Sequence, residues 1–153
     1  MNRRNQIGMT FEELTAYLDE ARNMALCTVG KDGYPHVVAM SYMVKDSIIY
    51  MSSFKKAQKV LNAKRNKKVA VMVESGRGYS DLKGVLIRGD CEVIENPEDV
   101  WRIMKEVRDF QGTAVSLEED AVLRERAKKR AVLKITPVKT SSWDHTKLPT
   151  GVY

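Results

Sequence analysis

The feature that most constrains the fold is an alternation of apolar and charged residues between positions 83 and 95. One side is apolar or small and the other is charged: Val85, Ile87, Gly89, Cys91 and Val93 against Arg88, Asp90 and Glu92. Successive side chains of a β-strand point to opposite faces of its sheet, so this period predicts a strand with one buried and one solvated face. Such strands are typical of antiparallel sheets.

Further segments predict strands at residues 24–29, 34–44, 47–52, 69–74 and 131–142. Asp32-Gly33 is a hairpin signal, and Lys45-Asp46 predicts a second turn, so we expect the first three strands to form an antiparallel meander. Pro137 lacks the N–H that a central strand needs, which places its part of the last strand at an edge or a bulge.

Helices are expected over residues 10–21, 55–65, 97–110 and 116–130. Thr10 and Ser116 each begin a capping box, in which Glu follows three positions later. The predicted fold class is mostly β (α+β), with five or six antiparallel strands and peripheral helices. Because a sheet of that length tends to curl, we expect a barrel or partial barrel in a single domain over residues 1–153.

Composition and charge narrow the expected cellular location and the possible binding partners of the chain. No apolar run approaches the roughly 20 residues of a membrane span, and the first ten residues lack the hydrophobic stretch of a signal peptide. Cys27 and Cys91 lie far apart in apolar stretches, which indicates buried thiols and a cytoplasmic location. The formal charge of +6 suits nucleic acid, a membrane surface or an anionic small molecule. Basic strand positions such as Arg88 have acidic neighbours, so we do not expect nucleic-acid binding, and we expect no membrane partner.

The most informative local feature is the segment from Ser52 to Lys59. Two hydroxyls, Ser52 and Ser53, precede the expected helix, and three lysines fall in its first turns: Lys55, Lys56 and Lys59. Without compensation, a cation near a helix N-terminus is disfavoured by about 0.3–1 kcal/mol. A phosphate there reverses the sign, because backbone N–H groups, hydroxyls and ammonium groups converge on it. The alternative is a solvated lysine-rich face, since the basic run continues to residue 68.

Side chains for catalysis without a cofactor are few. The histidines are His36 and His145, and no spacing of His, Cys, Asp or Glu suggests a metal site. Asp144-His145 is either part of an acid/base pair or, more commonly for such neighbours, polar surface. The residues around Gly76 predict a plain turn. Difficult chemistry would therefore belong to a bound cofactor. The side chains of the strand over residues 35–42 could line the flat ring of such a cofactor or, alternatively, pack in the protein core.

The order of these segments resembles the pyridoxamine 5'-phosphate oxidase-like split-barrel superfamily. The resemblance rests on ALCTVGKDGYPH (residues 25–36), IYMS (residues 49–52) with the lysine-bearing helix behind it, VAVMV (residues 69–73) and KGVLIRG (residues 83–89). The SWDH run at residues 142–145 is similar to a C-terminal signature of one branch. The resemblance implies a split β-barrel of about six strands, a homodimer, and FMN or the deazaflavin coenzyme F-420 in grooves between the subunits.

The resemblance also implies a set of cofactor-binding residues. Lys59 matches the phosphate-contacting lysine, with Lys55 or Lys56 as the basic residue upstream and Ser52 and Ser53 as the hydroxyls. The ring would lie along the strand, and other residues of the motifs complete the set: His36, Val38, Ala39, Met40, Ser41, Tyr50 and Met51. From the partner subunit, Lys83, Gly84 and Trp143 would reach the cofactor.

The chain departs from the vitamin-forming oxidases at two places. They carry an Arg-Gln pair where this chain has Lys83-Gly84, and they have a C-terminal substrate-phosphate motif that is missing here. We therefore expect an oxidoreductase that passes hydride between the cofactor and an unidentified small organic substrate, and not pyridoxamine phosphate oxidation. The alternative is a non-catalytic FMN-binding or redox-sensing protein on the same fold.

Overall fold

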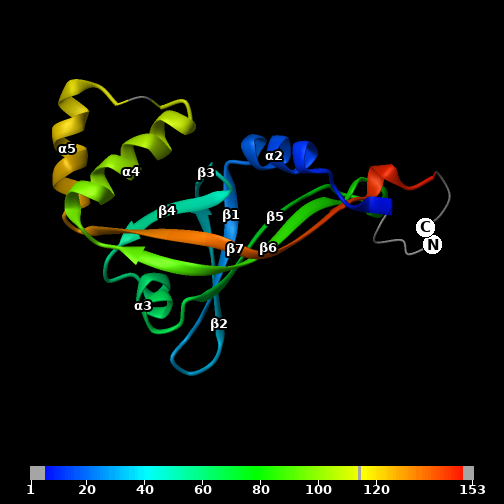
Figure 1. The fold of residues 1–153 in the computed structure, drawn as a ribbon, viewed down its shortest axis with the longest axis horizontal. Coiled ribbons are helices and arrows are strands. Elements are labelled where there is room, and N and C mark those ends of the chain that lie inside the picture. Colours follow the sequence, from blue (N-terminus) through cyan, green and yellow to red (C-terminus); the bar gives the residue numbers. More distant parts are fainter. Residues whose placement is uncertain (1–5, 114, 150–153) are drawn as a thin grey trace.

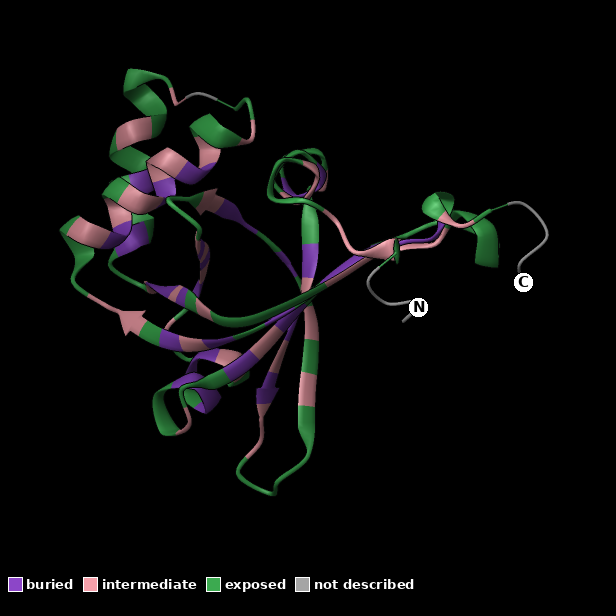
Figure 2. Cartoon of the chain, turned by 45° about the vertical axis from the view of Figure 1, so that its right-hand side comes forward, coloured by how far each residue is buried: buried purple, intermediate pink, exposed green. Residues whose placement is uncertain are grey.

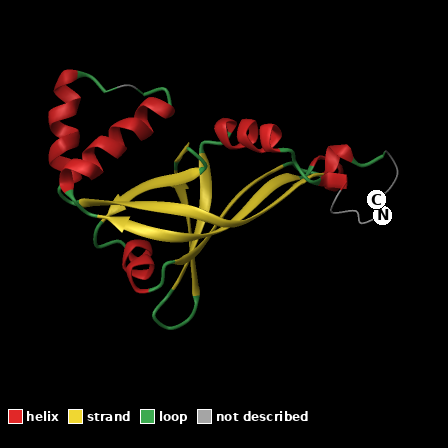
Figure 3. Ribbon diagram, viewed as in Figure 1, coloured by secondary structure: helices red, strands yellow, loops and turns green. Residues whose placement is uncertain are grey.

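The computed structural model describes residues 6–113 and 115–149, which form a curled antiparallel sheet with helices around it (Figures 1 and 3). The elements are, in chain order, α2 (Phe11–Glu20), β1 (Asn23–Val29), β2 (Pro35–Ser41), β3 (Met43–Lys45), β4 (Ile48–Phe54), α3 (Gln58–Arg65), β5 (Lys68–Ser75), the 3-10 helix η1 (Tyr79–Asp81), β6 (Lys83–Ile94), α4 (Pro97–Phe110), α5 (Leu117–Ala127), β7 (Arg130–Asp144) and the 3-10 helix η2 (His145–Lys147). The predicted class of a mostly antiparallel barrel is confirmed.

The barrel closes through the segment predicted as one strand over residues 34–44. The strand order is β2-β1-β5-β6-β7-β4-β3, so β2 and β3 stand at opposite ends of the sheet although only Tyr42 separates them. β2 pairs with β1, and β3 pairs with β4. The predicted single strand was wrong at Tyr42, because the buried Tyr42 ring turns inward and its hydroxyl donates to the carbonyl of Leu18 at 2.5 Å.

The predicted turn and the predicted bulge are both present, and the turn lies one residue later than expected. The turn expected at Lys45-Asp46 lies at Asp46 and Ser47, which have φ of 52° and 63°. Pro137 lies at the predicted bulge, since Gly89 pairs with Pro137 while its neighbour Arg88 pairs with Lys139. The bulge is not at an edge, because β7 lies between β6 and β4 in the sheet.

Two apolar clusters hold the fold together (Figure 2). Inside the barrel, alternate residues of the strands are buried, and those predicted on β6 follow this pattern: Val85, Ile87 and Cys91 are buried. Outside it, α4 and α5 cover β4 and the start of β7 around Val100, Met104 and Leu123. None of the helices in the two described ranges is long and apolar enough to cross a bilayer.

Candidate functional site

The end of β4 and the start of α3 bring Ser53 and Lys59 together. The Lys59 ammonium donates to the Ser53 hydroxyl, with Nζ and Oγ 3.4 Å apart. Ser53 is buried at the end of β4 and Lys59 is half-buried, so this contact fixes where the ammonium group lies. The helix begins at Ala57 as N-cap, whose side chain caps no backbone N–H. A positive charge and free backbone donors therefore meet at one helix end, the arrangement that binds an anion.

Lys55 and Lys56 do not lie in the helix as predicted. α3 begins at Gln58, and the two lysines occupy the turn before it. The backbone N–H of Lys55 donates to the carbonyl of Lys129 at 3.1 Å, which ties the turn to the chain leading into β7. The two side chains flank the helix N-terminus and do not oppose its dipole from within the first turn.

The basic residues of this region differ in their partners. Lys64 pairs with Glu95 at 2.7 Å, and Lys67 pairs with Asp90 at 2.9 Å. Among the described residues, no carboxylate lies within 4.0 Å of the ammonium groups at the helix start: Lys55, Lys56 and Lys59. The later lysines therefore form the solvated, paired face of the alternative interpretation, whereas the early ones present uncompensated charge.

Arg130 adds a further cation that sequence reasoning missed. It pairs with Phe54 in the β4–β7 ladder, and its guanidinium carbon lies 4.5 Å from the centre of the Phe54 ring. Its Nε is buried and has no hydrogen-bond partner among the described residues. Because the pairing joins positions far apart in sequence, no local pattern signalled it.

A cavity of about 480 Å³ lies beside this helix end. Its walls come from the β1–β2 hairpin and one face of α3: Gly30, Lys31, Asp32, Tyr34, Pro35, His36, Gln58 and Asn62. The predicted site residue His36 thus lines the same cavity as Gln58 and Asn62 of α3. The buried Asn62 is held in place, since its Nδ2 donates to Thr28 Oγ1 at 3.0 Å and its Oδ1 accepts from Gln58 and Arg65. In the sequence, the α3 wall of this cavity was signalled only by two polar residues four positions apart, Gln58 and Asn62.

The predicted ring-lining residues of β2 lie on two different faces of the sheet. Val38 and Met40 point into the barrel core, whereas Ala39 and Ser41 are exposed on the outer face. β2 pairs only with β1, so its second edge has no ladder partner within the described sheet. The backbone groups on that edge are free to hydrogen-bond a ligand.

Three residues of β4 that were expected to bind the cofactor do not lie beside Lys59. The Met51 side chain is completely buried in the barrel core, and Tyr50 packs against the cluster under α4 and α5. Ser52 lies on the same outer face as Tyr50, opposite Val132. These side chains do not join Lys59. The helices over Tyr50 were predicted from the sequence, but their packing against β4 was not.

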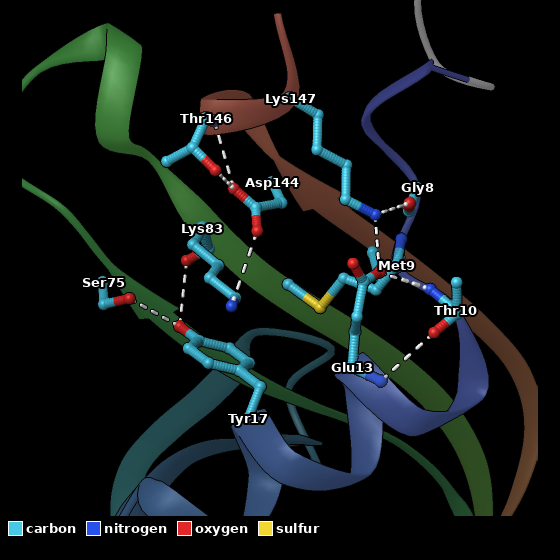
Figure 4. A network of polar contacts seen from close by, with 11 residues as sticks. Gly8, Met9, Thr10, Glu13, Tyr17, Ser75, Lys83, Asp144, Thr146 and Lys147 are labelled. Atoms are coloured by element: carbon cyan, nitrogen blue, oxygen red, sulfur yellow. Dashed lines mark hydrogen bonds and ion pairs between the residues drawn. The ribbon is translucent and has the colours of Figure 1, made fainter.

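Lys83, Gly84 and Trp143 lie in a different part of the molecule, where β6 begins and β7 ends (Figure 1). Gly84 pairs with Trp143, and the indole occupies the space that a side chain at Gly84 would need. The Lys83 ammonium lies 3.5 Å from Asp144 Oδ2 and 5.1 Å from the centre of the Tyr17 ring (Figure 4). Within one chain these residues do not form one site with Lys59.

Asp144 and His145 are buried, not polar surface. Partial burial acts to raise the pKa of Asp144, but hydrogen bonds from Thr146 and the charge of Lys83 outweigh it and leave that pKa lowered. His145 Nδ1 lies 2.7 Å from the carbonyl of Tyr79. The two side chains bond to different partners and serve the junction of β6, β7 and η2.

The expected plain turn around Gly76 is confirmed, since Asp81 accepts from the backbone N–H groups of Arg77 and Gly78.

The donor set at α3 fits the phosphate of a flavin-type cofactor. Lys59 would supply charge, the uncapped helix would supply N–H groups, and the edge of β2 without a ladder partner in the described sheet would supply backbone groups for a ring. No group of three or more His, Cys, Asp or Glu residues in the described parts of the chain is arranged to hold a metal ion.

Comparisons with known proteins give a consistent picture. The chain is similar over 95% of its length to the conserved hypothetical protein Rv2991 from Mycobacterium tuberculosis, with 33% identity, a TM-score of 0.86 and 92% of that chain covered. It shares its fold with an F-420 reductase (22% identity, TM-score 0.65, 82% of this chain and 94% of that one). It also shares its fold with HutZ, a haem storage protein from Vibrio cholerae (14% identity, TM-score 0.64, 88% and 93%).

No curated protein sequence matches the chain significantly. The sequence profile described as pyridoxamine 5'-phosphate oxidase matches residues 10–144, which is most of the chain and spans the whole sheet. Together with the similarity to Rv2991, this match establishes the relationship that the motif order implied. The chain belongs to the pyridoxamine 5'-phosphate oxidase-like split-barrel family.

Proposed function

We propose that this protein is an oxidoreductase that binds FMN, or alternatively the deazaflavin coenzyme F-420, and passes hydride between the cofactor ring and a small organic substrate. The observation that carries the proposal is the set of lysines at the uncapped start of α3 that form no ion pair with a described residue, beside a strand whose second edge has no ladder partner in the described sheet. The F-420 alternative is supported by the shared fold with an F-420 reductase.

The phosphate would lie at the N-terminus of α3. Lys59, oriented by Ser53, would bind one phosphate oxygen, and the N–H groups of the first helical turn would bind another. Lys55 and Lys56 would add charge from the preceding turn. Ser53 is too buried to be the main ligand itself, and its role would be to hold the Lys59 ammonium in place.

The ring would lie along the edge and outer face of β2. Ala39 and Ser41 point outward there, whereas Val38 and Met40 would contribute backbone groups only. The cofactor supplies the capacity to accept and return a hydride. The protein would supply orientation, hydrogen bonds to the ring and exclusion of water from the groove.

The complete site would need a second subunit. The outer face of the sheet carries a continuous apolar row, in which the register places Ala39 beside Ala25, Ala25 beside Met72 and Met72 beside Leu86. Met72 and Leu86 are large and exposed in the single chain. A homodimer formed through this face would bury the row and bring the partner's β6–β7 end toward the cofactor, the place expected of Lys83, Gly84 and Trp143.

A non-catalytic binding or redox-sensing protein is the second candidate. It is supported by the shared fold with HutZ, which is described as a storage protein. The two candidates differ in turnover. Under anaerobic conditions and continuous photoreduction by an excess of a sacrificial electron donor, an oxidoreductase would reduce many equivalents of an organic acceptor per bound cofactor, whereas a storage or sensing protein would not.

The test of the phosphate site compares two ligands that differ by one phosphate. We expect the wild-type protein to bind FMN more tightly than riboflavin, as measured by quenching of flavin fluorescence. Lys59→Ala should weaken FMN binding about tenfold, the value of one charge-assisted hydrogen bond, and leave riboflavin binding unchanged. The matched control is Lys67→Ala, which removes a lysine paired with Asp90. An unchanged FMN affinity in Lys59→Ala would show that the phosphate lies elsewhere. Failure to bind both FMN and F-420 would refute the proposed function.

A further inference from the structure

A second cavity lies between α2 and one end of the barrel. Its volume is about 300 Å³. Its apolar walls come from α2 on one side and from the barrel strands on the other: Phe11, Leu14, Leu18, Val44, Ile49 and Ile87. It shares no lining residue with the cavity beside α3, so it is a separate feature of the fold.

The β-bulge in β7 helps to form this cavity. Ile135 points into the barrel and Pro137, two residues on, lines the cavity. The extra residue at Val138 shifts the alternation, so that Thr140, opposite Ile87, lines the same cavity. A proline ring and a short hydroxyl side chain from β7 thus line the cavity. Bulges are over-represented at barrel rims and next to active sites, where they redirect side chains.

The polar groups of this cavity are few. Thr15, Asp19, Ser47 and Thr140 line it together with the apolar walls. The Thr15 hydroxyl donates to the carbonyl of Phe11 at 2.9 Å, so its proton is not available to a ligand. Asp19 is exposed and forms no ion pair with a described residue. Its carboxylate accepts hydrogen bonds and repels anions.

We propose that this cavity binds a compact, largely apolar and uncharged molecule that carries one hydrogen-bond donor, with the donor directed to Asp19. An apolar cavity of roughly 150 Å³ holds benzene, so this one has room for a fused two-ring molecule. Sites of this type combine mostly apolar walls with a few polar groups that fix orientation. The inference stands apart from the proposed function, because no residue of the phosphate site contributes to it.

The experiment titrates two probes of the same shape into the full chain. Indole has an N–H donor, and indene lacks it. Binding is followed in two-dimensional NMR spectra of the methyl groups. We expect indole to shift the methyl signals of Leu14, Leu18, Val44, Ile49 and Ile87. Indole should bind about threefold more tightly than indene, as one solvent-accessible hydrogen bond allows. Asp19→Asn should reduce that preference without abolishing the binding of either probe.

A filling variant tests the location. Leu14→Trp should abolish indole binding, whereas the matched Leu117→Trp, at a fully solvated position of α5, should leave it unchanged. The proposal is overturned if indole shifts none of these methyl signals at millimolar concentration, or if the two probes bind equally well. It is also overturned if the same signals move with protein concentration alone, because a second copy would then fill the cavity. Parallel FMN titration separates these outcomes from failure of the phosphate site.

Discussion

Replacing Gly84 by alanine should destabilise the protein through a collision that cannot be relieved locally. A Cβ at this position would overlap the Cζ2 atom of Trp143, and it would lie 2.6 Å from Cε2 of the same ring and 2.9 Å from the carbonyl oxygen of Val73. The indole can rotate, but the carbonyl belongs to the β5–β6 ladder, where Glu74 pairs with Gly84, and cannot move without breaking it.

The magnitude follows from these contacts. Adding a methyl group to a well-packed site costs typically 1–3 kcal/mol, and a backbone obstacle places this site at the upper end of that range. The lower entropy of an unfolded chain with alanine returns about 0.4–1 kcal/mol. We therefore expect a net loss of about 2 kcal/mol in the free energy of unfolding, which corresponds to a fall of about 4–8 °C in Tm for a chain of this size.

The assay is urea denaturation followed by far-ultraviolet circular dichroism, which does not depend on the fluorescence of Trp143. Gly78→Ala is the matched control, because a Cβ there has only an ordinary contact, 3.4 Å from Asp81 Oδ1. In a Trp143→Ala background the cost of Gly84→Ala should fall, and the residual cost measures the Val73 carbonyl. If Gly84→Ala lies within 0.5 kcal/mol of the wild-type protein, the close packing of this strand pair is wrong.

Three further predictions concern other parts of the fold. Burial raises the pKa of the Cys91 thiol to about 12, so at pH 8 a disulfide reagent should modify the half-buried Cys27 and leave Cys91 unmodified until the protein is denatured. The lowered pKa of Asp144 adds stability above the pKa of the unfolded state and loses it as the pH falls below roughly 4, so Asp144→Asn should flatten that acid limb in denaturation curves. Asn96 accepts from the backbone N–H groups of Glu98 and Asp99 at the start of α4, and Asn96→Ala should cost about 1 kcal/mol by urea denaturation.

Local signals in the sequence predicted most of the elements. The capping boxes at Thr10 and Ser116 begin α2 and α5 as expected, because each depends on residues three positions apart. The alternation over β6 identified its buried face for the same reason. The start of α3 was misplaced because Lys55 and Lys56 are compatible with a helix, whereas the hydrogen bonds from Lys55 N–H to Lys129 and from Ala57 N–H to Phe54 hold them in a turn.

The candidate site was less predictable, because its geometry depends on contacts between distant segments. Ser53 and Lys59 were both predicted for the site because they lie close in sequence, but the direct contact between them was not predicted. The neighbours of Tyr50 under α4 and α5, and the pairing of Arg130 with Phe54, come from positions far apart in the chain. The resemblance to a family supplied what periodicity cannot, namely which strand and which helix are expected to face a cofactor.

The central place of β7 has a consequence for synthesis on the ribosome. Up to the end of α5, the chain contains two sheets that share no ladder, β2-β1-β5-β6 and β4-β3. Within the described sheet, only β7 joins them, through its ladders with β6 and β4. A nascent chain that stops before Arg130 therefore exposes an open strand edge on each half, and barrel closure has to wait until β7 has left the exit tunnel. The interval in which the protein is most open to aggregation or to chaperone binding is thus set by one late strand.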